Sequence, residues 1–262
     1  MADRANDLTL KLAKFLMEAD GYPITFSISG FIAYVTLSII TKGLRSPAKD
    51  RFLDLLNCSY SHLEESHERS FLEFKCLNSN EMIDFEKAGR VKSAIFHTKT
   101  PYETFKQMAF EHAGIEFQIV HDTNYALQYH LINEWGKTLE DVPFTNIFIE
   151  SMDEELSLLI FNEYFVRFQW KSPFNPKTTK DQYFKNIYDQ DVRVDMMRRI
   201  MYSRYYDDQE LMATIVFIPL EQDDMYAAVV LPHSTNNIMD LLRNMNVSLT
   251  LDLGPKSEIM VS

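Results

Sequence analysis

Histidines and cysteines are the side chains of this sequence that most readily carry chemistry near neutral pH. His62 and His67 follow Cys58 closely, so a thiol activated by a neighbouring imidazole is one chemistry to consider. The surrounding residues 57–85 are acidic, and negative charge raises a thiol pKa, which disfavours the reactive thiolate. The two histidines also stand five residues apart, a spacing that does not place them together on a helix face. The pattern therefore argues against a cysteine nucleophile.

The remaining candidates for acid–base or metal chemistry are weak. His121-Asp122 forms a pair at the end of an expected strand, and surface or satisfied histidines explain the set of seven better than catalysis. Cys and His lack metal-site spacing, no G-x-S-x-G turn is present, and seven glycines leave little room for a phosphate loop. Two carboxylate pairs are typical of solvated loops: Glu64-Glu65 and Asp223-Asp224. We predict no enzyme, no metal and no cofactor.

Two cysteines do not make a disulfide framework, so the sequence predicts that Cys58 and Cys76 are free thiols in a reducing compartment. The first sixteen residues are charged and amphipathic, which predicts no secretion signal. We expect a cytoplasmic protein, with an extracellular location as the alternative. For a cytoplasmic protein, the glycosylation sequons at Asn57 (Asn-Cys-Ser) and Asn246 (Asn-Val-Ser) mean little.

Composition predicts a folded, acidic protein. The 262 residues are 46% hydrophobic and 24% charged, with a formal net charge of −12, which disfavours nucleic acid and anionic membranes as partners. Residues 21–41 carry no charge, but serines, threonines and Pro23 interrupt them, so we expect a short strand and a buried helix, not a membrane span. The basic cluster between Arg193 and Arg204 is expected to be a solvated face.

Helices are expected mostly in the first half of the chain and strands in the second. Apolar periodicity and capping residues predict helices over 8–19, 30–41, 47–56, 102–112, 125–139 and 238–245. Strands are expected over 90–97, 117–120, 156–170, 212–219, 226–231 and 248–253, with 212–231 forming a hairpin. The long apolar run 156–170 is expected to be a central strand. One mixed domain over residues 1–262 is the economical interpretation.

Several spaced segments, in this order, resemble motifs of the serpins, the family that traps proteases with a mobile loop. The most specific is Asn162, Tyr164-Phe165, Trp170, Lys171 and Pro173-Phe174. Further similar segments are Phe26-Ser27-Ile28-Ser29, Ile132-Asn133-Glu134-Trp135, Val194-Asp195-Met196-Met197, Ile218-Pro219, Leu231-Pro232 and Leu253-Gly254-Pro255-Lys256. Phe168 stands where the family usually has glycine, and residues 57–89 match poorly.

The resemblance implies an α+β fold, a single serpin-like domain with a large mixed β-sheet, a bundle of N-terminal helices and C-terminal strands missing. It also implies structural positions. Ser27, Ser29 and Asn162 would lie in the family's shutter, a polar network under the opening sheet, and Trp170 would anchor the sheet.

The resemblance implies protease inhibition only where a reactive loop and a small-residue hinge are present. After Pro255 only KSEIMVS remains, and no run of small residues matches a hinge. We therefore expect a truncated, non-inhibitory member of the family. The alternatives are an incomplete gene model of an active inhibitor, and a binding or regulatory module that pairs through an uncovered sheet edge. We expect self-association or a protein partner at that edge, and a protease as partner only if a longer chain carries the loop.

Overall fold

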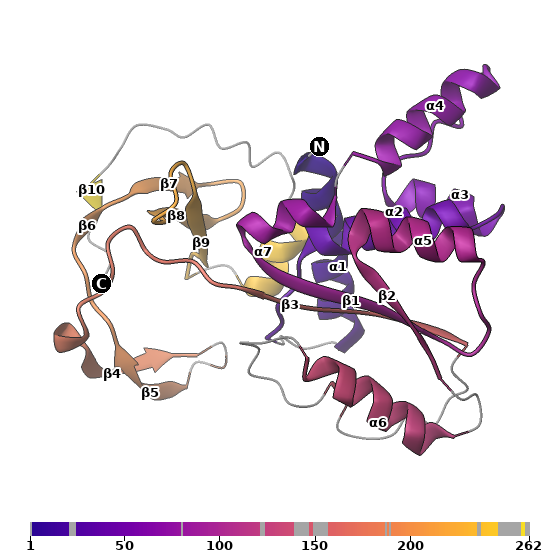
Figure 1. Ribbon diagram of the computed structural model, residues 1–262. Coiled ribbons are helices and arrows are strands. Elements are labelled where there is room, and N and C mark those ends of the chain that lie inside the picture. The colour runs from indigo at the N-terminus through magenta and orange to yellow at the C-terminus, as the bar shows by residue number, and fades with distance from the viewer. Residues whose placement is uncertain are drawn as a thin grey trace. The chain divides into compact units, whose positions relative to one another are not determined.

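The computed structural model describes residues 2–20, 25–79, 81–120, 124–138, 147–148, 157–186, 188, 190–234, 237–245 and 258–259 (Figure 1). The chain divides into two compact units. The first comprises residues 1–15 and 25–167, and the second comprises residues 16–24 and 168–262. Each unit is described by itself.

The first unit is built on a mixed three-stranded sheet in the order β2-β1-β3. β1 (Gly89–His97) pairs in parallel with β2 (Ile115–Ile119) and antiparallel with β3 (Leu158–Val166). Ser93 of β1 lies opposite Asn162 of β3 in this register. Among the residues that the structure describes, β3 is therefore an edge strand, and the expectation of a central strand over 156–170 is not met. The strand ends at Val166, before the predicted end at Trp170.

Helices cover one face of this sheet through α2 (Gly30–Gly43) and α5 (Glu103–Ala113), together with the 3-10 helix η1 (Met82–Lys87) (Figure 1). Ile32, Val35 and Ile39 of α2 pack with Ile95 and Ile115 of the sheet, all nearly inaccessible to solvent. The sequence predicts both α-helices to within a few residues. α5 ends at Gly114, whose φ of 60° suits glycine as a helix C-cap.

A second cluster joins α2 to three more helices: α1 (Ala2–Asp20), α3 (Ala48–Leu55) and α4 (Ser66–Leu77). Leu8, Tyr34 and Leu53 form its centre, and Cys58 and Cys76 are buried beside them. These cysteines form a disulfide, so the prediction of two free thiols is wrong. The sequence could not reveal the pair, because the helical turns that bring residues eighteen apart together lie in the segment that matches no familiar pattern.

The opposite face of the sheet packs against α6 (Tyr125–Gly136) (Figure 1). Ile132 and Trp135 of α6 contact Phe96 of β1, and the rings of Phe96 and Trp135 meet edge to face at 5.8 Å. Some side chains of β1 and β3 face α2 and others face α6, because successive side chains of a strand point to opposite faces of the sheet. α6 begins at the cap Asn124, whose side chain accepts a hydrogen bond from the backbone of Leu127.

The second unit consists mainly of antiparallel strands. β7 (Arg204–Asp208), β8 (Ala213–Pro219) and β9 (Tyr226–Pro232) form one sheet, which confirms the predicted hairpin over 212–231. β4 (Lys180–Lys185) pairs with β5 (Asp191–Met196), and β6 (Met201–Tyr202) pairs with β10 (Glu258–Ile259). The short helices η2 (Pro176–Thr178) and α7 (Ile238–Asn244) complete the unit.

The strands β4 to β7 were not expected from the sequence, because their side chains are largely exposed and lack an apolar alternation. Arg193 in β5 is exposed and forms an ion pair with Asp181 across that hairpin, whereas Arg199 and Arg204 are half-buried, so the expected solvated face holds for only part of the basic cluster. The predicted strand 248–253 and the pair His121-Asp122 lie outside the described residues. Among the helices described, none is both long and apolar enough to cross a bilayer.

Candidate functional site

The candidate site is a polar network beneath the edge strand β3. The side-chain oxygen Oδ1 of Asn162 accepts hydrogen bonds from Thr36 Oγ1 at 3.0 Å and from Ser93 Oγ at 2.7 Å. Thr36 belongs to α2 and Ser93 to β1, so one amide joins a helix and two strands. Thr36 and Ser93 are only 3% and 2% exposed. Hydrogen bonds buried this deeply fix the distance between α2 and the sheet.

Two of the sequence-predicted positions lie elsewhere in the first unit. Ser29 caps the N-terminus of α2, accepting a hydrogen bond from the backbone N–H of Ile32 at 3.3 Å. Ser27 is exposed in the segment that leads into the helix. The structure therefore brings Asn162 together with Thr36 and Ser93, and it places Ser29 at a helix end, where its contribution is to begin α2.

Trp170 lies in the second unit. Its backbone forms an isolated bridge with Leu220 next to β8, and its ring meets Phe174 edge to face at 6.4 Å. The side chain is half-buried. These contacts give Trp170 a packing role at the end of the β8–β9 hairpin.

Sequence reasoning missed Thr36 and Ser93, although a signal for both was present. Ser93 occupies an inward position of β1, in phase with Val91 and Ile95, where an apolar residue would be expected. Thr36 follows Ile32 by one helical turn on the apolar face of α2. A polar side chain at a core-facing position of a helix or strand requires a buried hydrogen-bond partner. Two such positions in neighbouring elements therefore point to a shared network.

The network lies beneath β3, and one edge of this strand has no partner among the described residues. β3 pairs with β1 along all nine of its residues, and no other strand among the described residues pairs with its second edge. Its inward side chains Ile160 and Tyr164 pack against the α2 face, so the strand is held firmly from beneath. A rigid strand with unpaired backbone groups is a template for another extended segment.

On the opposite face, a charged cluster lies beneath α6. Lys92 of β1 lies over the Trp135 ring at 5.0 Å, and Glu116 of β2 accepts a hydrogen bond from Trp135 Nε1 at 2.9 Å. Glu163, opposite Lys92 in the register, has one carboxylate oxygen buried without a hydrogen-bond partner among the described residues. Burial raises the pKa of Glu163, and the Lys92 cation offsets part of that effect.

Replacing Glu163 with glutamine should increase the free energy of unfolding at neutral pH. A carboxyl group whose pKa is raised on folding stabilises the protein fully below its unfolded pKa, and this contribution is lost as the pH rises through the folded pKa. The advantage of Glu163→Gln should therefore shrink as the medium is acidified. Urea unfolding across the acidic range measures it, with Glu86→Gln, which alters an exposed carboxylate of η1, as the matched control. Equal pH dependence in Glu163→Gln and the parent would contradict this assignment.

Asn133 holds a second segment of chain against α6. Its Oδ1 accepts hydrogen bonds from the backbone N–H groups of Ile147 and Phe148 at 2.8 and 2.9 Å, and its Nδ2 donates to the Phe148 carbonyl at 3.2 Å. Asn133 is 4% exposed, and the ring of Phe148 packs on Phe161 of β3. This side chain therefore helps to keep an aromatic cover over the sheet.

Asn133→Ala should lower the free energy of unfolding by about 1–2 kcal/mol, because it leaves two backbone donors without a partner in a site that water can partly reach. Chemical denaturation measures the loss. Asn186→Ala provides a control, since Asn186 forms comparable side-chain contacts in the β4–β5 turn but holds no core residue. Similar losses of unfolding free energy in the two variants would show that the contacts to residues 147–148 stabilise the protein no more than those of an exposed turn.

The chemically capable residues do not assemble into a catalytic centre in the described part of the chain. Cys58 is bonded to Cys76, so it offers no thiol to His62 or His67. His233 pairs with Asp207 at 2.8 Å across the β7–β9 sheet. His97 is buried, not at the surface, and its Nδ1 has no close hydrogen-bond partner within the described residues. Burial and the Lys106 cation lower the pKa of His97, and the backbone of Lys99 offsets part of that effect. No group of His, Cys, Asp and Glu suited to a metal ion occurs among these residues.

Comparison with known proteins matches a family model described as "Serpin (serine protease inhibitor)" over residues 3–258. Among curated proteins, Iripin-2 of Ixodes ricinus is 25% identical over 176 residues, which covers 66% of this chain and 43% of that protein. The chain spans between 21% and 49% of the length of the curated relatives that it matches.

Two solved structures show the same fold. Mouse protein-Z dependent protease inhibitor superposes with a TM-score of 0.77 at 18% identity, covering 94% of this chain and 66% of the other. Human thyroxine-binding globulin, solved in complex with thyroine, gives a TM-score of 0.78 at 17% identity, covering 95% of this chain and 66% of the other. At these identities the likeness concerns the fold alone.

Proposed function

Because the chain belongs to the serpin family, we propose that its 262 residues form a serpin body that binds an extended segment of another polypeptide and does not itself trap a protease covalently. Members of this family are protease inhibitors or binding proteins, and we assign this chain to the binding class. We propose no catalytic role for it.

The observation that carries the proposal is the edge of β3. Among the residues that the structure describes, this nine-residue strand pairs with β1 alone, and it rests on a buried network centred on Asn162. Its two ends present the exposed apolar residues Leu158 and Val166, at 49% and 46% exposure. An extended segment that pairs with β3 would satisfy its free backbone groups and cover these side chains.

Covalent trapping has further requirements, which support the non-inhibitory part of the proposal. The trap needs bait residues and a flexible hinge in the same polypeptide as the sheet, because the cleaved loop must insert as a new strand while still attached. The 262 residues contain no run of small residues that matches the hinge. We infer that these 262 residues supply the sheet but not the reactive loop that inserts into it.

The alternative is that these residues are part of a longer chain that inhibits proteases. The partial coverage of relatives such as protein-Z dependent protease inhibitor favours this second candidate, since 66% of that protein matches almost the whole of this chain. In a longer chain the inserting segment would come from the same polypeptide. The same β3 edge would then serve an intramolecular partner.

Incubation of the purified 262-residue protein with a panel of serine and cysteine proteases tests the proposal. We expect no complex that survives denaturing gel electrophoresis, because such a complex requires an acylated loop. A gel-stable covalent complex with any protease would refute the non-inhibitory assignment. An in-frame transcript that continues beyond codon 262, and whose product forms the complex, would establish the second candidate.

Binding at the sheet edge is tested with the double variant Leu158→Lys and Val166→Lys, beginning with a second copy of this chain as the partner. Both side chains are exposed, so the lysines should disturb folding little while opposing edge-to-edge pairing. We expect the parent to form concentration-dependent dimers in light scattering and the variant to remain monomeric. Val192→Lys, at an exposed site on β5, is the matched control. A parent that is monomeric and captures no partner would remove the support for edge binding.

We also propose that the protein folds in an oxidising compartment. The expectation of a cytoplasmic location rested on the lack of a secretion signal and on free thiols, and the second premise fails because Cys58 and Cys76 form a disulfide. Disulfides form and persist in secreted and extracellular proteins and are rare in the cytosol. The extracellular alternative is therefore the better proposal.

A further inference from the structure

The turn that ends α3 has an unusual backbone. Asn57 adopts a left-handed conformation, with φ of 53°. Its N–H donates to the carbonyl of Asp54 at 3.1 Å, and the next N–H, of Cys58, donates to the carbonyl of Leu53 at 2.8 Å. These two bonds define a Schellman ending, in which asparagine takes the place that glycine most often occupies. The turn directs residue 57 outward and residue 58 inward.

Exposure changes sharply between these two residues. The Asn57 side chain is exposed, whereas Cys58 is 0% exposed and bonded to Cys76. Asn57, Cys58 and Ser59 also spell an N-glycosylation sequon, in which the hydroxyl of the third residue is required for recognition. The acceptor asparagine therefore lies at the surface, while the middle residue of the same tripeptide is locked in the core.

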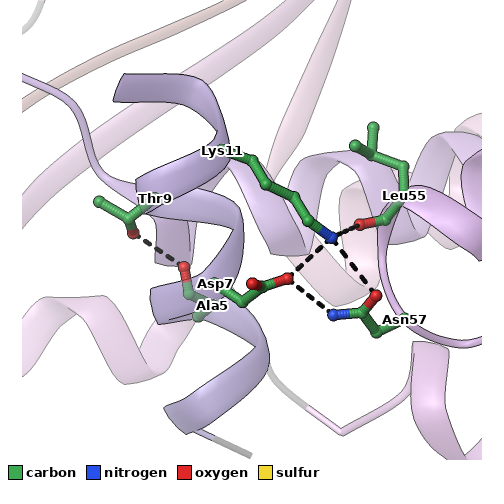
Figure 2. A network of polar contacts seen from close by, with 6 residues as sticks. All are labelled: Ala5, Asp7, Thr9, Lys11, Leu55 and Asn57. Carbon is green, nitrogen blue, oxygen red and sulfur yellow. Dashed lines mark hydrogen bonds and ion pairs between the residues drawn. The ribbon is translucent and has the colours of Figure 1, made fainter. Parts of the chain in front are cut away.

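The contacts of Asn57 leave room for a substituent. Figure 2 shows its carboxamide held between two residues of α1: Nδ2 donates to Asp7 Oδ2 at 2.7 Å, and Oδ1 accepts from Lys11 Nζ at 3.3 Å. Lys11 also forms an ion pair with Asp7 at 2.8 Å. A carboxamide nitrogen carries two hydrogens, and the bond to Asp7 uses one. A glycan would replace the other hydrogen, so a modified Asn57 can keep its contact with Asp7.

We propose that Asn57 is an N-glycosylation site, modified in the same oxidising compartment in which the disulfide forms. The donor is an oligosaccharide linked to a lipid diphosphate. A bond forms between Asn57 Nδ2 and the anomeric carbon of the first sugar, while the bond from that carbon to the diphosphate oxygen breaks. The lipid diphosphate leaves and Nδ2 loses one proton. Nothing is oxidised or reduced in this step.

The structure also fixes the order of the two modifications. An enzyme that recognises the tripeptide must reach the backbone and side chains of residues 57–59 together. In the folded unit the N–H of Cys58 is engaged by Leu53 and its side chain is buried. Transfer of the glycan therefore precedes closure of the Cys58–Cys76 bond, and the two reactions compete. Chains that close the disulfide first remain unmodified at Asn57.

Translation of the full 262-residue chain behind a cleavable secretion leader, in the presence of endoplasmic reticulum microsomes, tests this inference. All variants carry Asn246→Gln, so that residue 57 is the one sequon left. We expect a gel shift that peptide-N-glycosidase removes, in part of the parent chains. The shift should be lost in Ser59→Ala and kept in the matched control Ser61→Ala. Cys76→Ser keeps the sequon intact and prevents closure, so its occupancy should exceed that of the parent.

Two results would overturn the inference. Leader-processed chains that lack the glycan in both the parent and Cys76→Ser would show that Asn57 is not a site. Equal occupancy in the parent and Cys76→Ser would refute the competition. The readout does not require the variants to fold, because modification is scored on the translocated chain. It is also independent of protease trapping and of the β3 edge, so it can fail or succeed whatever the outcome for the proposed function.

Discussion

Replacing both disulfide cysteines with alanine should lower the free energy of unfolding by about 3 kcal/mol. Cys58 and Cys76 are eighteen residues apart, and cross-links that close loops of this size restrict the unfolded chain by about that amount. The bond also has a local role. Cys76 and Leu77, the last two residues of α4, are its buried residues, so this helix is attached to the core at its C-terminal end. We expect faster amide exchange along α4 in the variant.

Denaturation under non-reducing conditions measures the loss, and the parent treated with reductant should approach the behaviour of the double variant. Tyr34 adds a second effect, because its buried hydroxyl lies 3.2 Å from Cys58 Sγ and 3.5 Å from Cys76 Sγ. Adding Tyr34→Phe to the double cysteine variant should therefore recover part of the lost stability. The added substitution removes a buried hydroxyl that has lost its contacts with the two sulfur atoms. A double variant as stable as the oxidised parent would contradict the role given to the disulfide.

Much of the first unit could be predicted from its sequence, for identifiable physical reasons. α2 and β1 carry strong local signals: the helix has a serine cap and a mostly apolar sequence without charge before Lys42, and the last five residues of the strand are buried. Elements of this kind can be recognised from the local sequence, because their signals do not depend on distant contacts. The β8–β9 hairpin was predictable because the acidic turn at residues 221–224 separates two apolar runs.

Features that depend on long-range contacts could not be predicted in the same way. The partners of Asn162 lie 126 and 69 residues away in sequence, so the local patterns that mark Thr36 and Ser93 as buried polar positions could not pair them with Asn162. The disulfide depends on how α3 and α4 pack, and α4 lies in the acidic segment that carries no recognisable motif. The exposed hairpin β4–β5 escaped detection for the opposite reason. Its strands bury no side chain among the described residues, so apolar alternation is absent.

Replacing Asn162 with leucine should destabilise the first unit by about 2–4 kcal/mol. The substitution leaves the hydroxyl groups of Thr36 and Ser93 without their acceptor in a site almost closed to water, and each unpaired buried group costs about 1–3 kcal/mol. The triple variant Thr36→Val, Ser93→Ala and Asn162→Leu removes donors and acceptor together, so it should recover much of the loss. Its stability should exceed that of the single variant.

The comparison of single and triple variants separates a polar network from ordinary packing. If Asn162 contributes only volume, the triple variant should be at least as unstable as Asn162→Leu, because two further side chains have changed. Urea denaturation of both proteins decides between these outcomes. The same variants bear on function, since β3 is held from beneath by this network. Loss of edge-dependent dimerisation in Asn162→Leu, with recovery in the triple variant, would show that the network positions β3 for pairing and does not bind the incoming segment itself.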